Sequence, residues 1–104
     1  MPFVQLIEFK TGRINEFNAI TDEWLKESAG WRTATRAQLG EDRDRPGTYV
    51  QVVEFPSYEA AMENSSRPET GRFAERIAAL CDGPSIFRNI DVLRLEEMWP
   101  GDGG

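Results

Sequence analysis

Residues 3–9, Phe-Val-Gln-Leu-Ile-Glu-Phe, return almost unchanged as residues 49–55, Tyr-Val-Gln-Val-Val-Glu-Phe. The second copy lies near the start of the second half of the chain, so the sequence predicts a duplicated unit. Matching strands at the head of two similar halves are typical of a folded pair of βαβ units. The repeat therefore restricts the possible folds and the places where a ligand could bind. It does not identify a reaction.

Length and composition indicate an ordinary soluble globular protein. Of the 104 residues, 39% are hydrophobic and 29% are charged, which is neither a disordered nor a fibrous composition. We expect residues 1–97 to form one domain and residues 98–104 a flexible C-terminal tail. A chain of this size buries only about 60–70% of its unfolded surface. A second folded copy would therefore add stability.

Targeting signals are not visible in the sequence. No apolar run approaches the roughly 20 residues that a membrane-spanning helix needs. Met1-Pro2-Phe3 leads directly into a strand, without the basic segment and apolar core of a secretory signal. Cys81 is the single cysteine and has no intramolecular disulfide partner. We therefore expect a cytoplasmic protein that does not interact with membranes.

Charge and histidine content exclude several classes of function. The formal net charge of −6 argues against a nucleic-acid partner, because such proteins carry clustered Lys and Arg. The chain has no histidine, which removes the commonest general base near neutral pH and the commonest ligand for zinc or haem iron. We expect no metal and no other cofactor. The acidic and basic residues 41–45 are expected to form a solvated hairpin loop.

The order of elements follows from periodicity and turn signals. Residues 3–9 alternate as a strand with two mostly apolar faces, which predicts cover on both sides. The strand segments are residues 3–9, 31–39, 48–55 and 86–95, and the helices are expected at residues 13–29, from Ser57 to about Asn64, and from Pro68 to Cys81. Ser57 is the expected N-cap of the second helix, and Pro68 fits the first turn of the third.

This β-α-β-β-α-β order predicts a ferredoxin-like α+β fold, a four-stranded antiparallel sheet with helices on one face. We expect the two repeated strands to be a parallel central pair, with Gln5 beside Gln51 and Glu8 beside Glu54 on the opposite face. The face without helices stays rich in apolar side chains, which usually marks a partner surface. The sequence therefore predicts a homodimer through the sheet face, with an isologous interface.

The element order and residues 53–62, Val-Glu-Phe-Pro-Ser-Tyr-Glu-Ala-Ala-Met, resemble the antibiotic-biosynthesis-monooxygenase type of dimeric α+β barrel over nearly the whole chain. The resemblance implies a homodimer with a small-molecule ligand between helices and sheet. Its cofactor-free members oxidise phenolic substrates whose own carbanion reduces oxygen. Haem-degrading members carry an iron-binding histidine where this chain has residues 72–77 without one, so haem degradation is not expected.

On this resemblance the site is expected to hold a phenolate or enolate by arginine, orient its carbonyl by amides and sandwich its rings between aromatics. The candidate catalytic residues are Arg36, Asn64 and Arg88, and the candidate substrate-binding residues are Gln5, Trp24, Tyr49, Gln51 and Phe73. The alternative is a non-catalytic dimeric module for small-molecule binding or stress response, since one fold serves many functions.

Structural roles are open for several candidates. Trp24 could be core and Trp31 could close the helix-to-strand junction, while Asn64 could satisfy a frayed helix end. Gln5 and Gln51 could bond to each other or to dimer-related groups rather than to a ligand.

Two further polar groups have alternative interpretations. Glu8 and Glu54 could be buried together as a base of raised pKa, or could pair with Arg32, Arg36, Arg88 or Arg94 on neighbouring strands. The second arrangement is favoured. Cys81 lies on the apolar stripe expected for the third helix, which also contains Phe73, Ala74, Ile77, Ala78 and Leu80. It is expected to be a small core residue without a nucleophilic role.

Overall fold

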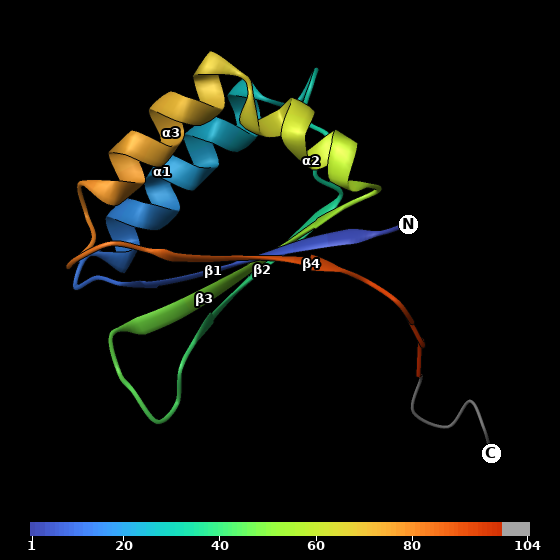
Figure 1. Cartoon of the computed structure of the whole chain (residues 1–104). Coiled ribbons are helices and arrows are strands. Elements are labelled where there is room, and N and C mark those ends of the chain that lie inside the picture. Colours follow the sequence, from blue (N-terminus) through green and yellow to red (C-terminus); the bar gives the residue numbers. More distant parts are fainter. Residues whose placement is uncertain (99–104) are drawn as a thin grey trace.

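A computed structural model describes residues 1–98 as one sheet with helices on one of its faces (Figure 1). The order of strands and helices is the predicted one, with the helix of the second half divided in two. The elements are β1 (Phe3–Lys10), α1 (Ile14–Glu27), β2 (Arg36–Glu41), β3 (Thr48–Phe55), α2 (Tyr58–Ser65), α3 (Pro68–Ala78) and β4 (Ile86–Asp91). The four-stranded ferredoxin-like arrangement is thereby confirmed.

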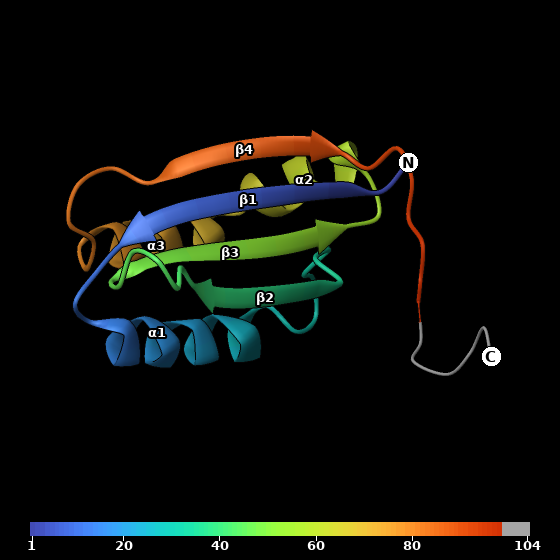
Figure 2. The ribbon, with the colours of Figure 1, turned by 90° about the horizontal axis from the view of Figure 1, so that it is seen from below.

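The sheet has the strand order β2-β3-β1-β4, with every neighbouring pair antiparallel (Figure 2). The repeated strands β1 and β3 are the central pair, as predicted, but the expectation that they run parallel is wrong. Helix α1 returns the chain so that β2 runs in the direction of β1, and the following hairpin then reverses β3. Gln5 consequently lies opposite Val53, and Gln51 lies opposite Ile7.

Alternation along the central strands assigns their two faces. Phe3 and Phe9 at the ends of β1 are buried, and each packs with helical residues. The odd-numbered residues of β1 and β3 therefore face the helices. The even-numbered residues form what we call the helix-free face, with the apolar side chains Val4, Leu6, Val50 and Val52 in the central strands.

Two separate apolar clusters hold the helices on the sheet. The Phe3 cluster consists of Phe3, Phe55 and Ala61 and attaches α2. The Phe9 cluster consists of Phe9, Phe17 and Leu80 and attaches α1 and the end of the α3 region. Phe9 and Phe17 stack with centroids 4.8 Å apart. The core is thus divided along the strands, with a gap between its aromatic ends.

The helix ends follow the sequence signals. Ser57 accepts a hydrogen bond from the backbone N–H of Ala60 at 3.0 Å, so the predicted N-cap is confirmed. Pro68 begins α3, where its missing N–H costs no helical hydrogen bond. Ser28 ends α1, and its Oγ donates to the Trp24 carbonyl at 2.6 Å.

Both edge strands are shorter or shifted relative to prediction. Strand β2 begins at Arg36 rather than at residue 31, because Thr33 bonds to α2, with its Oγ1 donating to the Ala60 carbonyl at 2.6 Å. Strand β4 ends at Asp91 rather than at residue 95. Val92 still donates its backbone N–H to the Pro2 carbonyl at 3.0 Å, but proline has no N–H with which to continue the ladder.

Two other expectations on burial need correction. Ala74 and Ala78 were expected on the apolar stripe of α3, yet both are exposed, since α3 turns its Phe73 and Ile77 side inward. Cover on both faces of β1 is also wrong for the single chain, in which only one face carries helices (Figure 1). The predicted tail falls almost wholly outside the described residues.

Candidate functional site

Two half-buried glutamines lie between the Phe3 and Phe9 clusters. Gln5 and Gln51 occupy adjacent rungs on the helix-facing side of β1 and β3, which makes them diagonal neighbours. Gln5 Nε2 donates to Asn89 Oδ1 on β4 at 3.3 Å. The sequence therefore placed both amides on one face correctly, although it paired them directly across the strands. We call this pair the glutamine band.

An aromatic wall continues from the Phe9 cluster along α1. Trp24 lies seven residues beyond Phe17, on the same helical stripe. Its indole stacks on Phe73 of α3, with centroids 5.2 Å apart and planes at 29°. Trp31 meets Trp24 edge to face at 6.3 Å. Two of the three predicted aromatic residues, Trp24 and Phe73, are thus brought together by the packing of α1 on α3.

Helix and strand geometry gives the position of this wall along the strand direction. Helix α1 begins near the contact between Phe17 and Phe9. It then runs opposite to β1 on the β2 side of the sheet (Figure 2) and rises away from the sheet (Figure 1). Seven helical residues from Phe17 to Trp24 cover roughly 10 Å. Four strand residues from Phe9 to Gln5 cover roughly 13 Å. Measured along the strand direction, Trp24 therefore reaches about the level of Gln5, and both residues belong to the side of the sheet that carries the helices.

Three buried polar atoms in the helical layer have no hydrogen-bond partner among residues 1–98. They are Thr21 Oγ1 and Trp24 Nε1 on α1, and Thr70 Oγ1 on α3. An unpaired buried donor costs on the order of 1–3 kcal/mol. Buried polar atoms in native folds nearly always have a hydrogen-bond partner. A bound molecule with acceptor atoms would supply the missing partners.

Asn64 is the most buried of the candidate polar side chains, at 6% exposure. It lies in the last turn of α2, and its Oδ1 accepts a hydrogen bond from the backbone N–H of Thr33 at 3.3 Å. This contact ties the segment before β2 to α2. The interpretation of Asn64 as a local structural residue therefore gains a specific partner.

Arg36 and Arg88 lie on the helix-free face, across the sheet from the glutamine band. In the ladder, Arg36 pairs with Glu54 and Arg88 pairs with Leu6. Arg36 Nε donates to Glu54 Oε2 at 2.5 Å, so the predicted ion pair for Glu54 is confirmed. In the single chain, neither guanidinium is on the side of the aromatic wall.

The second glutamate pairs differently from expectation. Glu8 Oε1 lies 3.8 Å from Nη2 of Arg45 in the hairpin loop, rather than beside an arginine on a strand. Glu8 and Glu54 are not neighbours, because Glu8 lies opposite Val50 and Glu54 lies opposite Val4. The antiparallel register thus separates the two carboxylates, and a shared buried base on this face is ruled out.

Tyr49 belongs to the Phe9 cluster. Its ring stacks on Phe9 with centroids 5.7 Å apart, at the opposite end of the glutamine band from Trp24. A ring sandwich between Tyr49 and Trp24 would therefore have to span the whole band.

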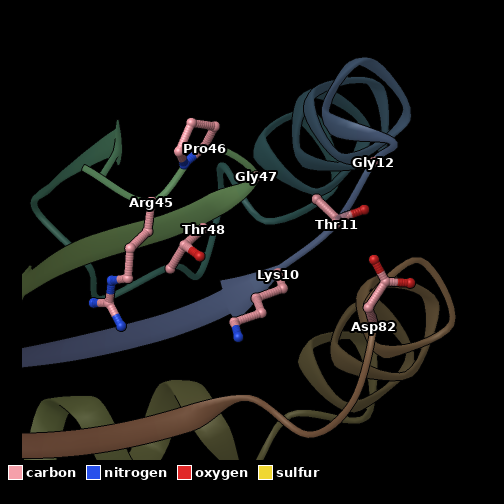
Figure 3. Close-up of a pocket in the computed structure, with 8 residues that line it drawn as sticks. All are labelled: Lys10, Thr11, Gly12, Arg45, Pro46, Gly47, Thr48 and Asp82. Carbon is pink, nitrogen blue, oxygen red and sulfur yellow. The ribbon is translucent and has the colours of Figure 1, made fainter. Parts of the chain in front are cut away.

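A surface hollow of about 470 Å³ lies at the far end of the sheet, lined by Lys10, Thr11, Gly12, Arg45, Pro46, Gly47, Thr48 and Asp82 (Figure 3). Backbone hydrogen bonds close its base, from Thr11 to Gly47 at 3.1 Å and from Asp82 to Lys10 at 2.7 Å. Arg45 is neutralised by Asp42, whose Oδ2 accepts from its Nε at 2.9 Å. The hollow is a junction of three loops rather than a continuation of the glutamine band.

Three further observations concern the Cys81 thiol, possible metal ligands and possible membrane-spanning helices. Burial raises the pKa of the Cys81 thiol, and its Sγ donates to the Ile77 carbonyl at 3.3 Å. Within residues 1–98 no three His, Cys, Asp or Glu side chains gather in a way that could hold a metal ion. None of the helices in the described part of the chain is long and apolar enough to cross a membrane.

Solved structures share this fold. SnoaB, a cofactor-independent oxygenase from Streptomyces nogalater, aligns with 90% of this chain and 95% of its own at 18% identity and a TM-score of 0.75. Rv0793 from Mycobacterium tuberculosis aligns over 93% and 100% at 16% identity and a TM-score of 0.74. A Caulobacter crescentus protein provisionally named an antibiotic biosynthesis monooxygenase aligns over 89% and 91% at 11% identity and a TM-score of 0.76.

No protein-family model and no curated protein sequence matches the chain. The predicted resemblance to antibiotic-biosynthesis-monooxygenase structures is confirmed at the level of the fold. Sequence identities of 11–18% indicate a shared fold but do not indicate a shared reaction.

Proposed function

We propose that the protein is a cofactor-independent monooxygenase-like enzyme that acts on a small planar molecule of aromatic or polyketide type. The observation that carries this proposal is that the glutamine band lies on the helix-facing side of the sheet, while Trp24 and Phe73 lie together in the helical layer on that side. The planar substrate binds between these two layers, and the amides of Gln5 and Gln51 donate hydrogen bonds to its carbonyl. The likeness to SnoaB, named as a cofactor-independent oxygenase, supports the same class.

The chemistry in this proposal belongs to the substrate. An acidic CH₂ that is conjugated with a carbonyl through an aromatic ring, as in anthrone, loses a proton to solvent water, and the amide donors stabilise the enolate that forms. This carbanion reduces dioxygen, one oxygen atom enters the product as a new carbonyl, and the other leaves as water. The protein contributes proximity and hydrogen bonds. Arg36 and Arg88 have no role in this scheme within one protomer, because the sheet separates them from the band.

Oxygen uptake with anthrone- and naphthol-type compounds tests the proposal. We expect turnover by the wild type that persists after treatment with a chelator. Gln5→Leu and Gln51→Leu should each lower kcat at least about tenfold, because each removes an enolate donor. Asn18→Leu is the matched control, since Asn18 is an exposed amide on α1, outside both the glutamine band and the helix-free face. Equal uptake in all four proteins would refute the assigned site, and ligand binding without any uptake would favour the non-catalytic binding module.

We also propose that the working unit is a homodimer that buries the helix-free face. All residues of β2 and β4 are exposed in the single chain, and Ile86 and Ile90 add to the apolar face of the central strands. Residues 92–98 continue from β4 without a strand partner, and they include Leu93 at 85% and Leu95 at 67% exposure. A second sheet would cover these apolar side chains.

Sedimentation analysis tests the dimer. Leu6→Glu places a charge at the centre of the helix-free face and is expected to shift the protein from dimer to monomer. Leu25→Glu is the control, because Leu25 is 42% exposed on α1, away from this face. A monomeric wild type would refute the dimer, and so would a Leu6→Glu protein that remains dimeric.

A further inference from the structure

Two arginines differ from the rest in their surroundings. Arg32 and Arg67 are half-buried, whereas the other arginines among residues 1–98 are exposed. Neither has a carboxylate within salt-bridge distance in the described part of the chain, although six of the exposed arginines do. A partly desolvated cation without a counter-ion is favourable only when something else compensates it.

Both guanidinium groups lie against the tryptophans of the helical layer. Arg32 Cζ is 5.6 Å from the Trp24 ring centroid, and Arg67 Cζ is 4.8 Å from the Trp31 ring centroid. The indoles themselves meet edge to face at 6.3 Å. We call these four residues the tryptophan–arginine cluster. It joins the C-terminal end of α1 to the break between α2 and α3 (Figure 1).

The local contacts hold the cluster in place. Arg32 Nη1 donates to the Leu25 carbonyl at 3.0 Å and to Ser28 Oγ at 2.8 Å. These acceptors are neutral, so they do not offset the positive charge of Arg32. Arg67 is the residue before α3, and its guanidinium donates to no protein group among residues 1–98, which leaves its donors available. A guanidinium with free donors over an aromatic face is suited to a carboxylate attached to a ring.

The unpartnered polar atoms are a second, independent observation. Trp24 Nε1 belongs to the cluster and is a buried donor without an acceptor. Thr21 lies one turn before Trp24 on α1, and Thr70 lies one turn before Phe73, on which Trp24 stacks. Unpaired donors beside unneutralised cations require the same complement, which is an acceptor-rich, negatively charged group.

We propose that the substrate is a planar aromatic monocarboxylate that binds beside the tryptophan–arginine cluster, with its carboxylate bound by Arg67 and with Arg32 adding positive potential. This inference rests on the proposed function, since it concerns the same aromatic wall, and it specifies the ligand's charge. A monoanion fits better than a phosphate ester, because the chain has a net charge of −6 and repels multiply charged ligands overall.

Calorimetric titration with 2-naphthoate and its neutral analogue 2-naphthamide tests the inference. We expect the wild type to bind the carboxylate at least about tenfold more tightly than the amide. In Arg67→Gln this preference should fall to within about twofold, whereas Arg43→Gln should keep it. Arg43 is the matched control because it is an exposed arginine and its substitution changes the net charge equally.

Arg32 needs a gentler substitution because its side chain also bonds to the end of α1. Arg32→Lys keeps the charge and is expected to preserve most of the carboxylate preference, with the fold checked by thermal unfolding. Equal binding of the two probes to the wild type would overturn the carboxylate assignment and leave the neutral aromatic site intact. An unchanged preference in Arg67→Gln, or no binding of either probe at millimolar concentration, would also overturn it. Oxygen uptake with uncharged substrates judges the proposed function separately.

Discussion

Trp24 of α1 and Phe73 of α3 stack with their ring centroids 5.2 Å apart and their planes at 29°. This contact joins one helix from each half of the chain. It lies beyond the Phe9 cluster in the helical layer. The pair therefore has a structural role, as a tie between the helices, and a role in the candidate site as one wall.

Phe73→Ala is expected to destabilise the fold by about 2 kcal/mol. The loss combines a half-buried phenyl group with the stacking energy, and so is smaller than for a fully buried ring. Urea unfolding followed by circular dichroism measures the change. Ala74→Ser is the control, because Ala74 is the exposed neighbour on the same helix. Equal stability of Phe73→Ala and wild type would show that the stack contributes nothing to the fold.

Asn64→Ala is expected to cost about 1–2 kcal/mol, because it leaves the Thr33 N–H without its acceptor in a partly buried place. Urea midpoints give the change. Asn18→Ala, an exposed substitution of the same type on α1, should have little effect or stabilise slightly, since alanine favours helices. If both variants behave alike, the link from α2 to the segment before β2 is not a stabilising contact.

Asp42 is expected to make the hairpin loop acid-sensitive. Its pKa is lowered by the backbone N–H of Asp44 and then by Arg45. A carboxylate with a lowered folded-state pKa stabilises the fold above its ordinary pKa of about 3.9 and loses this effect as the pH falls through the lower folded value. Near pH 6 the wild type should therefore have a higher melting temperature than Asp42→Asn. This difference in melting temperature should vanish at strongly acidic pH.

The Arg45→Gln background provides the control for that experiment. Arg45 is one of the two residues whose interactions lower the pKa of Asp42, through its side-chain hydrogen bond and its charge. The melting difference between Asp42 and its Asn variant should shrink in this background. A difference that grows as the pH falls would contradict the assigned direction.

Cys81 is expected to react slowly with iodoacetamide. Burial raises the pKa of its thiol, and the nearby Asp82 carboxylate raises it further. Only the thiolate reacts, so at pH 8 the native chain should be alkylated at least about tenfold more slowly than the urea-unfolded chain, as measured by mass spectrometry. Equal rates would mean that the Cys81 region opens readily in the native state.

Much of the candidate site could be predicted from the sequence, because it depends on the regular spacing of residues along strands and helices. The alternation of β1 and β3 assigns Gln5 and Gln51 to one face, and the helical spacing assigns Trp24 to the sheet-facing stripe. Arg36 and Arg88 were assigned to the same site by residue type alone, and type does not encode which face of a strand a side chain occupies. Arg32 and Arg67 were not selected as ligand-binding residues, because their distinguishing feature is burial without a counter-ion.

The sequence by itself determined the order of strands and helices, the caps at Ser57 and Pro68, and the two faces of each repeated strand. These depend on local periodicity and on residues with fixed backbone preferences. Only the tertiary structure decided that β1 and β3 run antiparallel, that Glu8 and Glu54 are apart, and which arginines lie beside the tryptophans. Direction and register are set by how the connections cross the sheet, and contacts between distant segments exist only once those connections are closed.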